Sequence, residues 1–314
     1  MAWPLIKLLP THTHFKFVRL APFAAIFSAL LIVGSCVSFF TQGLNLGIDF
    51  KGGTLIEVVT PGTANLSNLR NELGRIGVRD AQVQGFGAPN AAMLRFRPTE
   101  NGSAVDEVER IKQSLSKTTP GIVFKRVEVV GPKVSGELFK SGFVALGIAI
   151  ALMLLYIWFR FQLQFGLGAV IAVFHDIVLT LGLLSVLQIE FAMTSIAALL
   201  TVIGYSMNEK VITFDRLREN LRKFRKMPLR DVIDLSENER LSRTLITGST
   251  ALLALSGMLF LGGPALFPLI ITMMFGILIG TYSSVYVALP VILLWGVRRN
   301  DEAEPKGKPV TARP

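Results

Sequence analysis

Long runs of apolar residues follow one another along most of the chain. A bilayer core about 30 Å thick is crossed by a helix of about 20 predominantly apolar residues. Six runs approach or exceed this length. They cover residues 20–40, 138–158, 165–187, 191–207 with a continuation toward 214, 245–261 and 266–297. The pattern therefore predicts a membrane α-helical protein with six transmembrane helices.

Between residues 47 and 132 the apolar positions alternate with polar ones, which is typical of a water-soluble insert. We expect strands at 54–60, 81–86, 93–96 and 122–130, helices at 66–76 and from 103 onward, and a turn at 88–90. The order βαββαβ is that of an α+β ferredoxin-like domain. This insert contains no His and no Cys. Binding or mechanical coupling is therefore its expected role.

These elements divide the chain into five expected parts. They are a cytoplasmic N-terminus (1–19), the first transmembrane helix (20–41), an exported ferredoxin-like domain (42–136), transmembrane helices two to six with a cytoplasmic amphipathic loop at about 215–241 (137–297), and a cytoplasmic tail (298–314). Residues 33–36 loosely resemble a lipoprotein cleavage site. We favour a retained helix, because apolar sequence continues past Cys36.

The charges indicate the orientation of the spans and argue against a nucleic-acid partner. Hydrophobic residues make up 51% of the chain and charged residues 17%, against about 25% charged in soluble domains. The formal net charge is +10, and basic residues in membrane proteins mark the cytoplasmic side. They gather before the first span, after the fourth and after the sixth, whereas the short connections at 188–190 and 262–265 carry none. Both termini are therefore expected in the cytoplasm.

His175 and Asp176 interrupt the third apolar run near its middle. Neighbouring residues on a helix point about 100° apart, so the two are not expected to face one partner. They form either a buried hydrogen-bonded pair that fixes helix packing or a station for a proton. The second interpretation rests on the pKa of His near neutrality and on the upward shift that burial gives to an Asp.

Glu209 and Lys210 follow near the end of the fourth apolar run. A charge inside a membrane is costly and is by default a functional site with a partner. Arg243, just before the fifth run, is the expected partner of Glu209, and protonation of the carboxylate would release it. Alternatively these side chains extend to the cytoplasmic interface.

The segment after the fourth run is amphipathic, with Leu217, Leu221 and Phe224 opposite a row of basic residues as far as Pro228. We expect it to lie flat in the headgroup region. Gly276 and Gly280 have the spacing of a close helix contact. No phosphate-binding glycine loop or hydrolase elbow is present. We expect no enzymatic activity, no cofactor and no metal.

Several motifs in the chain resemble SecF proteins of the SecD/SecF family, within the resistance-nodulation-division superfamily. They are Gly-Ile-Asp-Phe-Lys-Gly-Gly-Thr (47–54), Phe-His-Asp (174–176), Gly-Tyr-Ser-Met-Asn (204–208), Phe-Asp-Arg-Leu-Arg-Glu-Asn (214–220), Ser-Arg-Thr-Leu-Ile-Thr (242–247), Gly-Gly (262–263) and Gly-Thr-Tyr-Ser-Ser (280–284). The motif residues carried over are Gly47, Asp49, Phe50, Gly52, Gly53, Asn208, Asp215 and Arg216.

The resemblance implies a subunit of the bacterial cytoplasmic (inner) membrane that pairs with SecD and assists the SecYEG channel in moving unfolded polypeptide outward. YajC and YidC are further implied partners, and the proton gradient is the implied energy source. The family usually has Asp where this chain has Glu209, and implies a coupling role for that acid with Arg243, beside Asp176 and His175. Two alternatives are a passive assembly scaffold and half of a small-molecule proton antiporter.

Overall fold

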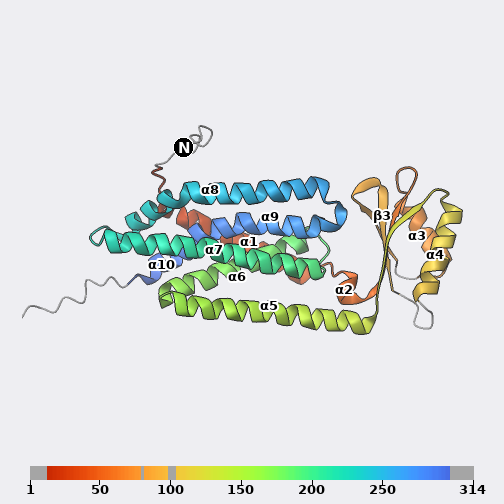
Figure 1. Ribbon diagram of the computed structural model, residues 1–314, viewed down its shortest axis with the longest axis horizontal. Coiled ribbons are helices and arrows are strands. Elements are labelled where there is room, and N and C mark those ends of the chain that lie inside the picture. Colours follow the sequence, from red (N-terminus) through yellow and green to blue (C-terminus); the bar gives the residue numbers. More distant parts are fainter. Residues whose placement is uncertain (1–12, 79–80, 98–103, 298–314) are drawn as a thin grey trace, which may run out of the picture.

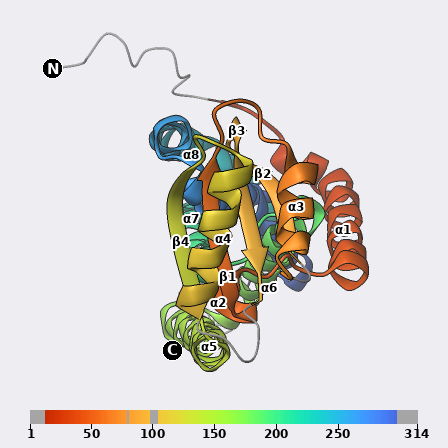
Figure 2. The same ribbon diagram turned by 90° about the vertical axis from the view of Figure 1, so that its right-hand side faces the viewer.

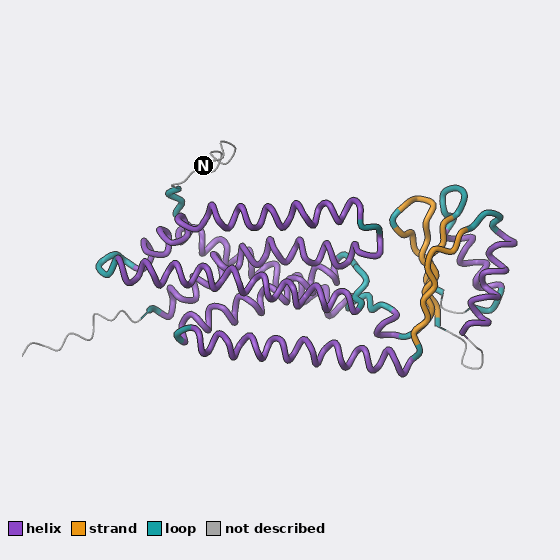
Figure 3. Tube along the Cα trace, viewed as in Figure 1, coloured by secondary structure: helices purple, strands orange, loops and turns teal. Residues whose placement is uncertain are grey.

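The computed structural model describes residues 13–78, 81–97 and 104–297. Long helices form a bundle, and a small sheet with two helices lies at one end of it (Figure 1). Coloured by secondary structure, the strands of the described residues all lie at that end (Figure 3). The expected tail at 298–314 and residues 1–12 of the expected N-terminus lie outside the described residues.

Five helical stretches of the described chain are long and apolar enough to cross a membrane. They are α1 (Phe17–Gln42), α5 (Pro132–Arg160), α6 (Leu163–Val186), α8 (Leu229–Leu261) and Phe267–Trp295. The last stretch consists of α9 (Phe267–Ser283), a π-helical turn (Ser284–Ala288) and α10 (Leu289–Trp295), and a short 3-10 turn (Pro264–Leu266) joins it to α8. The remaining predicted span corresponds to α7 (Met193–Lys223), which has 31 residues and is rich in polar side chains.

The predicted loop at 215–241 is wrong as a flat interfacial segment. The structure continues α7 to Lys223 and begins α8 at Leu229, so only a short turn separates them. Leu217 is fully buried against the core that contains Val232 and Ile233 of α8. The apolar side of this segment therefore packs on the neighbouring helix, which removes it from water more completely than a membrane surface would.

The small domain has the predicted element order. It contains β1 (Gly53–Val59), α3 (Leu66–Arg75), β2 (Gln82–Phe86), β3 (Ala88–Phe96), α4 (Ala104–Thr118) and β4 (Val123–Val130). The strand order is β2-β3-β1-β4, with every neighbouring pair antiparallel. Both helices cover the face turned away from the bundle (Figure 2), where Ile56, Leu73 and Leu94 are fully buried.

The expected turn at 88–90 is displaced toward the N-terminus. β3 already begins at Ala88, so Pro89 and Asn90 lie inside the strand. Gly87 has φ 75°, a conformation that costs glycine little because it has no Cβ. The chain therefore reverses at Gly87, and the proline is accommodated at the start of the strand.

Close contact of α7 with α9 depends on the two glycines predicted to pack there. A Cβ added to Gly276 would lie 2.1 Å from Val202 Cγ2, and one added to Gly280 would lie 3.0 Å from Ser206 Cβ. Small residues of this kind let two backbones approach. The prediction for Gly276 and Gly280 is confirmed, and their contact brings polar residues of the two helices within hydrogen-bonding distance.

Candidate functional site

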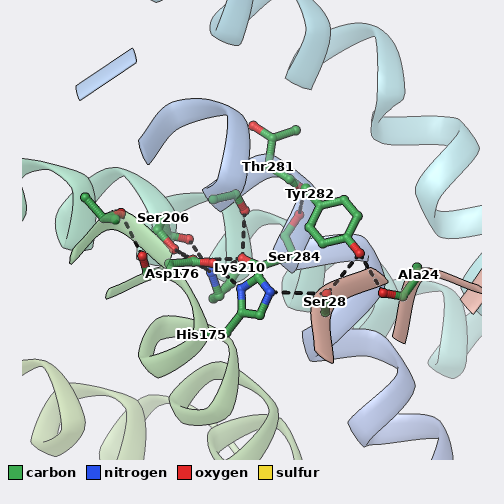
Figure 4. Close-up of polar contacts among 12 residues, drawn as sticks. Ala24, Ser28, His175, Asp176, Ser206, Lys210, Thr281, Tyr282 and Ser284 are labelled. Atoms are coloured by element: carbon green, nitrogen blue, oxygen red, sulfur yellow. Dashed lines mark hydrogen bonds and ion pairs between the residues drawn. The ribbon is translucent and has the colours of Figure 1, made fainter. Parts of the chain in front are cut away.

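An ion pair between Asp176 of α6 and Lys210 of α7 lies in the interior of the bundle (Figure 4). Lys210 Nζ is 2.9 Å from Asp176 Oδ2, and the two residues are 0% and 1% exposed. Ser206 Oγ and Ser283 Oγ also donate to Asp176 Oδ2. Such a pair is stable in a poorly hydrated interior only when further hydrogen bonds satisfy both charges. The serines meet that requirement.

Local helix geometry assembles this cluster. Ser206 and Lys210 are four residues apart and therefore lie on one face of α7. Ser283 is the last residue of α9, which the glycine contacts hold against α7. Lys210 Nζ donates to Ser283 Oγ over 3.0 Å. Three helices thus meet at one carboxylate.

His175 connects the carboxylate to α1. Its Nδ1 is 2.9 Å from Asp176 Oδ1, and its Nε2 is 3.2 Å from Ser28 Oγ. The ring stacks on Tyr282, whose hydroxyl donates to Ala24 O over 2.8 Å (Figure 4). His175 and Asp176 contact each other but have different further partners: His175 reaches Ser28 of α1, whereas Asp176 binds Lys210 of α7. A continuous hydrogen-bonded row therefore runs from Lys210 to Ser28.

A second buried cluster surrounds Glu209. Arg240 Nη1 lies 3.2 Å from Glu209 Oε2, and the same guanidinium binds Glu237 through Nη2 at 2.7 Å. Thr244 and Ser284 complete the shell, since Arg240 donates to Thr244 Oγ1 over 2.8 Å and to Ser284 Oγ over 3.0 Å. One arginine therefore serves two carboxylates.

The predicted pairing of Glu209 with Arg243 is wrong, and the partner lies three residues earlier. Arg243 is exposed, whereas Arg240 is 4% exposed and forms the ion pair. The reason is that α8 begins at Leu229, well before the apolar run that starts at 245. The helix face that meets α7 is therefore the one that carries Glu237, Arg240 and Thr244. A role for Arg243 in coupling stays a prediction.

The two clusters are adjacent along two different helices. Glu209 and Lys210 are neighbours on α7, and Ser283 and Ser284 are neighbours at the start of the π-helical turn. Together the clusters contain three carboxylates, Asp176, Glu209 and Glu237, against the two cations Lys210 and Arg240. Counted at their formal charges, these five groups carry one excess negative charge.

The glycine-rich motif after α1 forms the joint between bundle and sheet. Its residues make up the short helix α2 (Ile48–Lys51) and the turn that leads into β1. Asp49 Oδ2 accepts a hydrogen bond of 2.9 Å from Met193 N, at the start of α7, and Phe50 packs on Phe191 with ring centroids 5.6 Å apart. Gly47 N donates to Phe191 O over 2.9 Å. The motif therefore fixes the joint and lies away from the buried charges.

Gly52 and Gly53 end α2 with positive φ angles of 68° and 132°. A Cβ at Gly53 would also lie 2.8 Å from Phe96 O. Only glycine fits both the conformation and the space there. The pair therefore turns the chain directly from the joint into β1.

A further ion pair at this joint was not predictable from the sequence pattern. Arg95 of β3 lies 2.8 Å from Glu190, which precedes α7. Burial raises the pKa of Glu190 and nearby Asp49 raises it further, while Arg95 acts in the opposite direction. A cavity of about 460 Å³ opens beside the pair, between the sheet and the ends of α7 and α9. The Arg95–Glu190 salt bridge thus adds a charged contact to the hydrogen bonds and the aromatic packing that hold the joint.

The other motif residues lie on the outside. Asn208 is exposed, Asp215 pairs with Arg160 of α5 at 3.0 Å, and Arg216 pairs with Glu239 of α8 at 2.8 Å. Their contacts join the ends of three helices. The structure therefore places His175, Asp176 and Glu209 together and leaves these three outside the buried clusters.

Sequence reasoning singled out none of the other polar residues of the two buried clusters, which are Ser206, Glu237, Arg240, Thr244, Ser283 and Ser284. It also left open whether Lys210 reaches the interface, which the structure excludes because its side chain is fully buried. The spacing of Ser206 and Lys210, and that of Glu237, Arg240 and Thr244, was the available signal. Within the described residues, no group of three or more His, Cys, Asp or Glu side chains is arranged to hold a metal ion.

Two family models match the chain. "Protein export membrane protein SecD/SecF, C-terminal" covers residues 110–298, and "SecD/SecF GG Motif" covers residues 37–60. The second match contains the α2 joint with Gly52 and Gly53. The first contains all residues of the two buried clusters.

Similar proteins include protein translocase subunits SecF from two bacteria. The subunit from Cereibacter sphaeroides is 43% identical over 302 residues, which are 94% of this chain and 93% of the relative. The subunit from Vibrio alginolyticus is 39% identical over 303 residues, which are 96% of each chain. These relatives are named for a transport role.

Two solved structures of SecDF have a similar fold. The crystal structure of SecDF from Thermus thermophilus, described as a translocon-associated membrane protein, matches with TM-score 0.83 and 31% identity over 92% of this chain. SecDF in a super-membrane-facing form matches with TM-score 0.65 and 30% identity over 94% of this chain. The chain spans only 39% and 40% of those two chains.

Proposed function

Because the chain belongs to the SecD/SecF family, as a SecF protein translocase subunit of the export machinery, we propose that it couples a proton gradient to polypeptide export through its two buried charge clusters. The observation that carries the proposal is the imbalance of three carboxylates against two cations inside the bundle. Buried ionisable groups in membrane helices mark proton and ion pathways. With one excess negative charge, the bundle interior can exist in a deprotonated and a protonated state. The two states differ in their ion pairs and therefore in the helix packing that they favour.

The coupling step is a change in ion pairing. A proton on one carboxylate weakens its attraction for the cation beside it, and the helices that carry the pair then lose one of the contacts that hold them together. Moving one charge through 100 mV supplies about 2.3 kcal/mol. That is sufficient to shift a two-state equilibrium about fiftyfold. His175 and Ser28 extend the row of polar groups toward α1, as a proton path requires.

The architecture assigned to this function has α7 as a sixth transmembrane helix and the small domain as an exported ferredoxin-like domain. Two observations support it. α7 is 31 residues long and lies beside α9 within the bundle (Figure 1), and the strand order β2-β3-β1-β4 with the order βαββαβ fits that fold. We place the termini in the cytoplasm and the domains at the boundaries expected from the sequence.

The proposed partners are SecD, the SecYEG channel and the translocating polypeptide, with YajC and YidC as further candidates, in the bacterial inner membrane. The support for SecD is that the chain spans 39% of a SecDF chain with a similar fold. The lipid-facing surfaces of α1 and α5 carry exposed Phe, Leu and Trp side chains. A second membrane subunit would cover part of these surfaces.

The test measures gradient-dependent export in inverted membrane vesicles that contain the full chain and its SecD partner. Asp176→Asn and Glu209→Gln should each remove most of the increase in export that the gradient gives. Glu219→Gln is the matched control, because Glu219 is an exposed carboxylate on the same helix. If both buried variants export like the control, the charges are not used. A subunit that is then still required for export is a passive scaffold, which contradicts the proposal.

A further inference from the structure

A charged cavity is lined by the last residue of α5 and by the second half of α7. These helix ends lie at the end of the bundle opposite the sheet (Figure 1). Its volume is about 530 Å³. Its lining residues are Arg160, Asp215, Arg218, Glu219, Arg222 and Lys223. Four of these are cations and two are carboxylates, so the lining carries two excess positive charges.

Both carboxylates of the lining already have partners. Asp215 accepts two hydrogen bonds of 3.0 Å from Arg160, and Glu219 lies 2.6 Å from Arg216. Within residues 13–78, 81–97 and 104–297, neither Arg218 nor Arg222 forms an ion pair with a carboxylate. Arg218 instead lies over the ring of Phe161, 5.9 Å from its centroid. These two guanidinium groups therefore remain available for an anion.

The exposed aromatic residues beside the cavity indicate that it lies at the depth of the membrane interface. Trp158 and Phe159, which directly precede Arg160, are 73% and 81% exposed. Exposed aromatic side chains at the end of a transmembrane helix gather at the level of the lipid headgroups. The cavity therefore adjoins an apolar, lipid-facing surface on one side and water on the other.

We propose that this cavity binds the headgroup phosphate of an anionic phospholipid. Arg218 and Arg222 hold the phosphate, since a guanidinium can give a phosphate two parallel hydrogen bonds. The acyl chains lie along the exposed surface near Trp158 and Phe159. A soluble phosphate compound offers the same phosphate group but has no acyl chains to contact that surface. The site is independent of the proposed proton coupling, because none of its residues belongs to the buried clusters.

The experiment titrates the detergent-solubilised full chain with phosphatidylglycerol and with phosphatidylcholine, and follows the first bound lipid by native mass spectrometry. The wild-type chain should bind phosphatidylglycerol more tightly than phosphatidylcholine. Arg218→Gln with Arg222→Gln should weaken the binding of phosphatidylglycerol about tenfold or more, because it removes the charge-assisted hydrogen bonds that hold the phosphate. The affinity for phosphatidylcholine should change little.

The charge-matched control replaces Lys226 and Arg230 by Gln. Both are exposed at the same end of the bundle and outside the cavity, so the affinity for phosphatidylglycerol should stay within about twofold. An equal loss in the control variant overturns the proposal, because attraction would then come from overall charge. Equal affinity of the wild-type chain for the two lipids overturns it as well.

Two further measurements keep the result interpretable. Arg218→Lys with Arg222→Lys retains the charge but not the paired hydrogen bonds, and should lose less affinity than the Gln variant while keeping the wild-type melting temperature. Glycerol 1-phosphate should fail to displace the lipid at equal concentration. If it competes equally well, the cavity recognises a soluble anion and the assignment to lipid is wrong.

Discussion

The two buried clusters differ in how their cations are shared. Lys210 is matched to a single carboxylate, Asp176, and is surrounded by serine hydroxyls. Arg240 is shared by Glu209 and Glu237. A lysine ammonium is a compact point charge, whereas a guanidinium offers a planar fork of five donors. The first cluster is therefore a closed pair, and the second has one carboxylate more than its cation needs.

Under the proposed proton coupling, this difference favours one of the two clusters as the proton acceptor. Protonation of Asp176 leaves Lys210 charged in an apolar interior without a counter-ion. Protonation of Glu209 leaves Arg240 paired with Glu237, to which Nε also donates over 2.8 and 2.9 Å. The second change costs less, because removing one partner of an isolated buried pair is strongly destabilising. We infer that Glu209 is the proton-accepting side and that Asp176 with Lys210 holds the three helices in position.

The largest expected effect is that of Arg240→Gln. The variant leaves two buried carboxylates without their cation and should lower the free energy of unfolding by about 3–5 kcal/mol. Denaturant titration in mixed micelles measures it. Arg243→Gln is the control, since Arg243 is exposed, and should cost no more than about 0.5 kcal/mol. Similar losses for the two variants would contradict the pairing of Arg240 with Glu209.

Lys210→Met should cost about 3 kcal/mol, because it isolates Asp176. Adding Asp176→Asn should recover much of this loss, since the double variant buries no charge. The double-mutant cycle, measured by the same unfolding titration, should give a coupling energy above about 1 kcal/mol. Additive effects would mean that the two residues do not act as a closed pair.

Glu209→Gln should cost less, on the order of 1 kcal/mol, because Arg240 keeps Glu237. Its effect on gradient-dependent export should nevertheless be large. This split between stability and export distinguishes the two clusters, and vesicle export measured beside unfolding tests it. A variant that loses stability as much as Lys210→Met, with export unchanged, would reverse the assignment.

The smallest effect is expected at the joint between sheet and bundle. Burial raises the pKa of Glu190 above 4.5, so the folded chain binds this proton more tightly than the unfolded chain. Its contribution to stability is therefore fully present below pH 4.5 and is lost as the pH rises through the raised pKa. Glu190→Gln should flatten that dependence in unfolding titrations from about pH 4 to about pH 7. An unchanged slope would show that Glu190 is not responsible.

The sequence alone located most helices and strands, because apolar runs and alternation directly reflect burial. It could not locate the partner of Glu209. Arg240 lies outside the apolar run that marked the fifth span, so hydropathy assigned it to a loop. Burial of Lys210 was equally hidden, since a charge near the end of an apolar run can reach the interface. Both facts depend on how α7 and α8 pack beyond the apolar runs, and that is a tertiary property.

The family resemblance and the local chemistry were informative about different parts of the molecule. The motif with Gly52 and Gly53 carried the resemblance, and in the structure it forms the joint to the sheet. Asp176 belongs to a family motif and was also a candidate on chemical grounds, because a carboxylate in the middle of an apolar run needs a partner wherever it occurs. Asn208, Asp215 and Arg216 were candidates only because they match family motifs, and they lie outside the buried clusters.

The π-helical turn Ser284–Ala288 determines which face α10 turns toward the bundle. A π turn contains about one residue more than an α turn. Return of this turn to α geometry would rotate the residues after it by about 100° relative to those before it. Leu289 and Ile292, which now lie in the core beside Phe165 and Ala169 of α6, would then turn away from that core. The extra residue therefore selects which face of the last helix packs on α6.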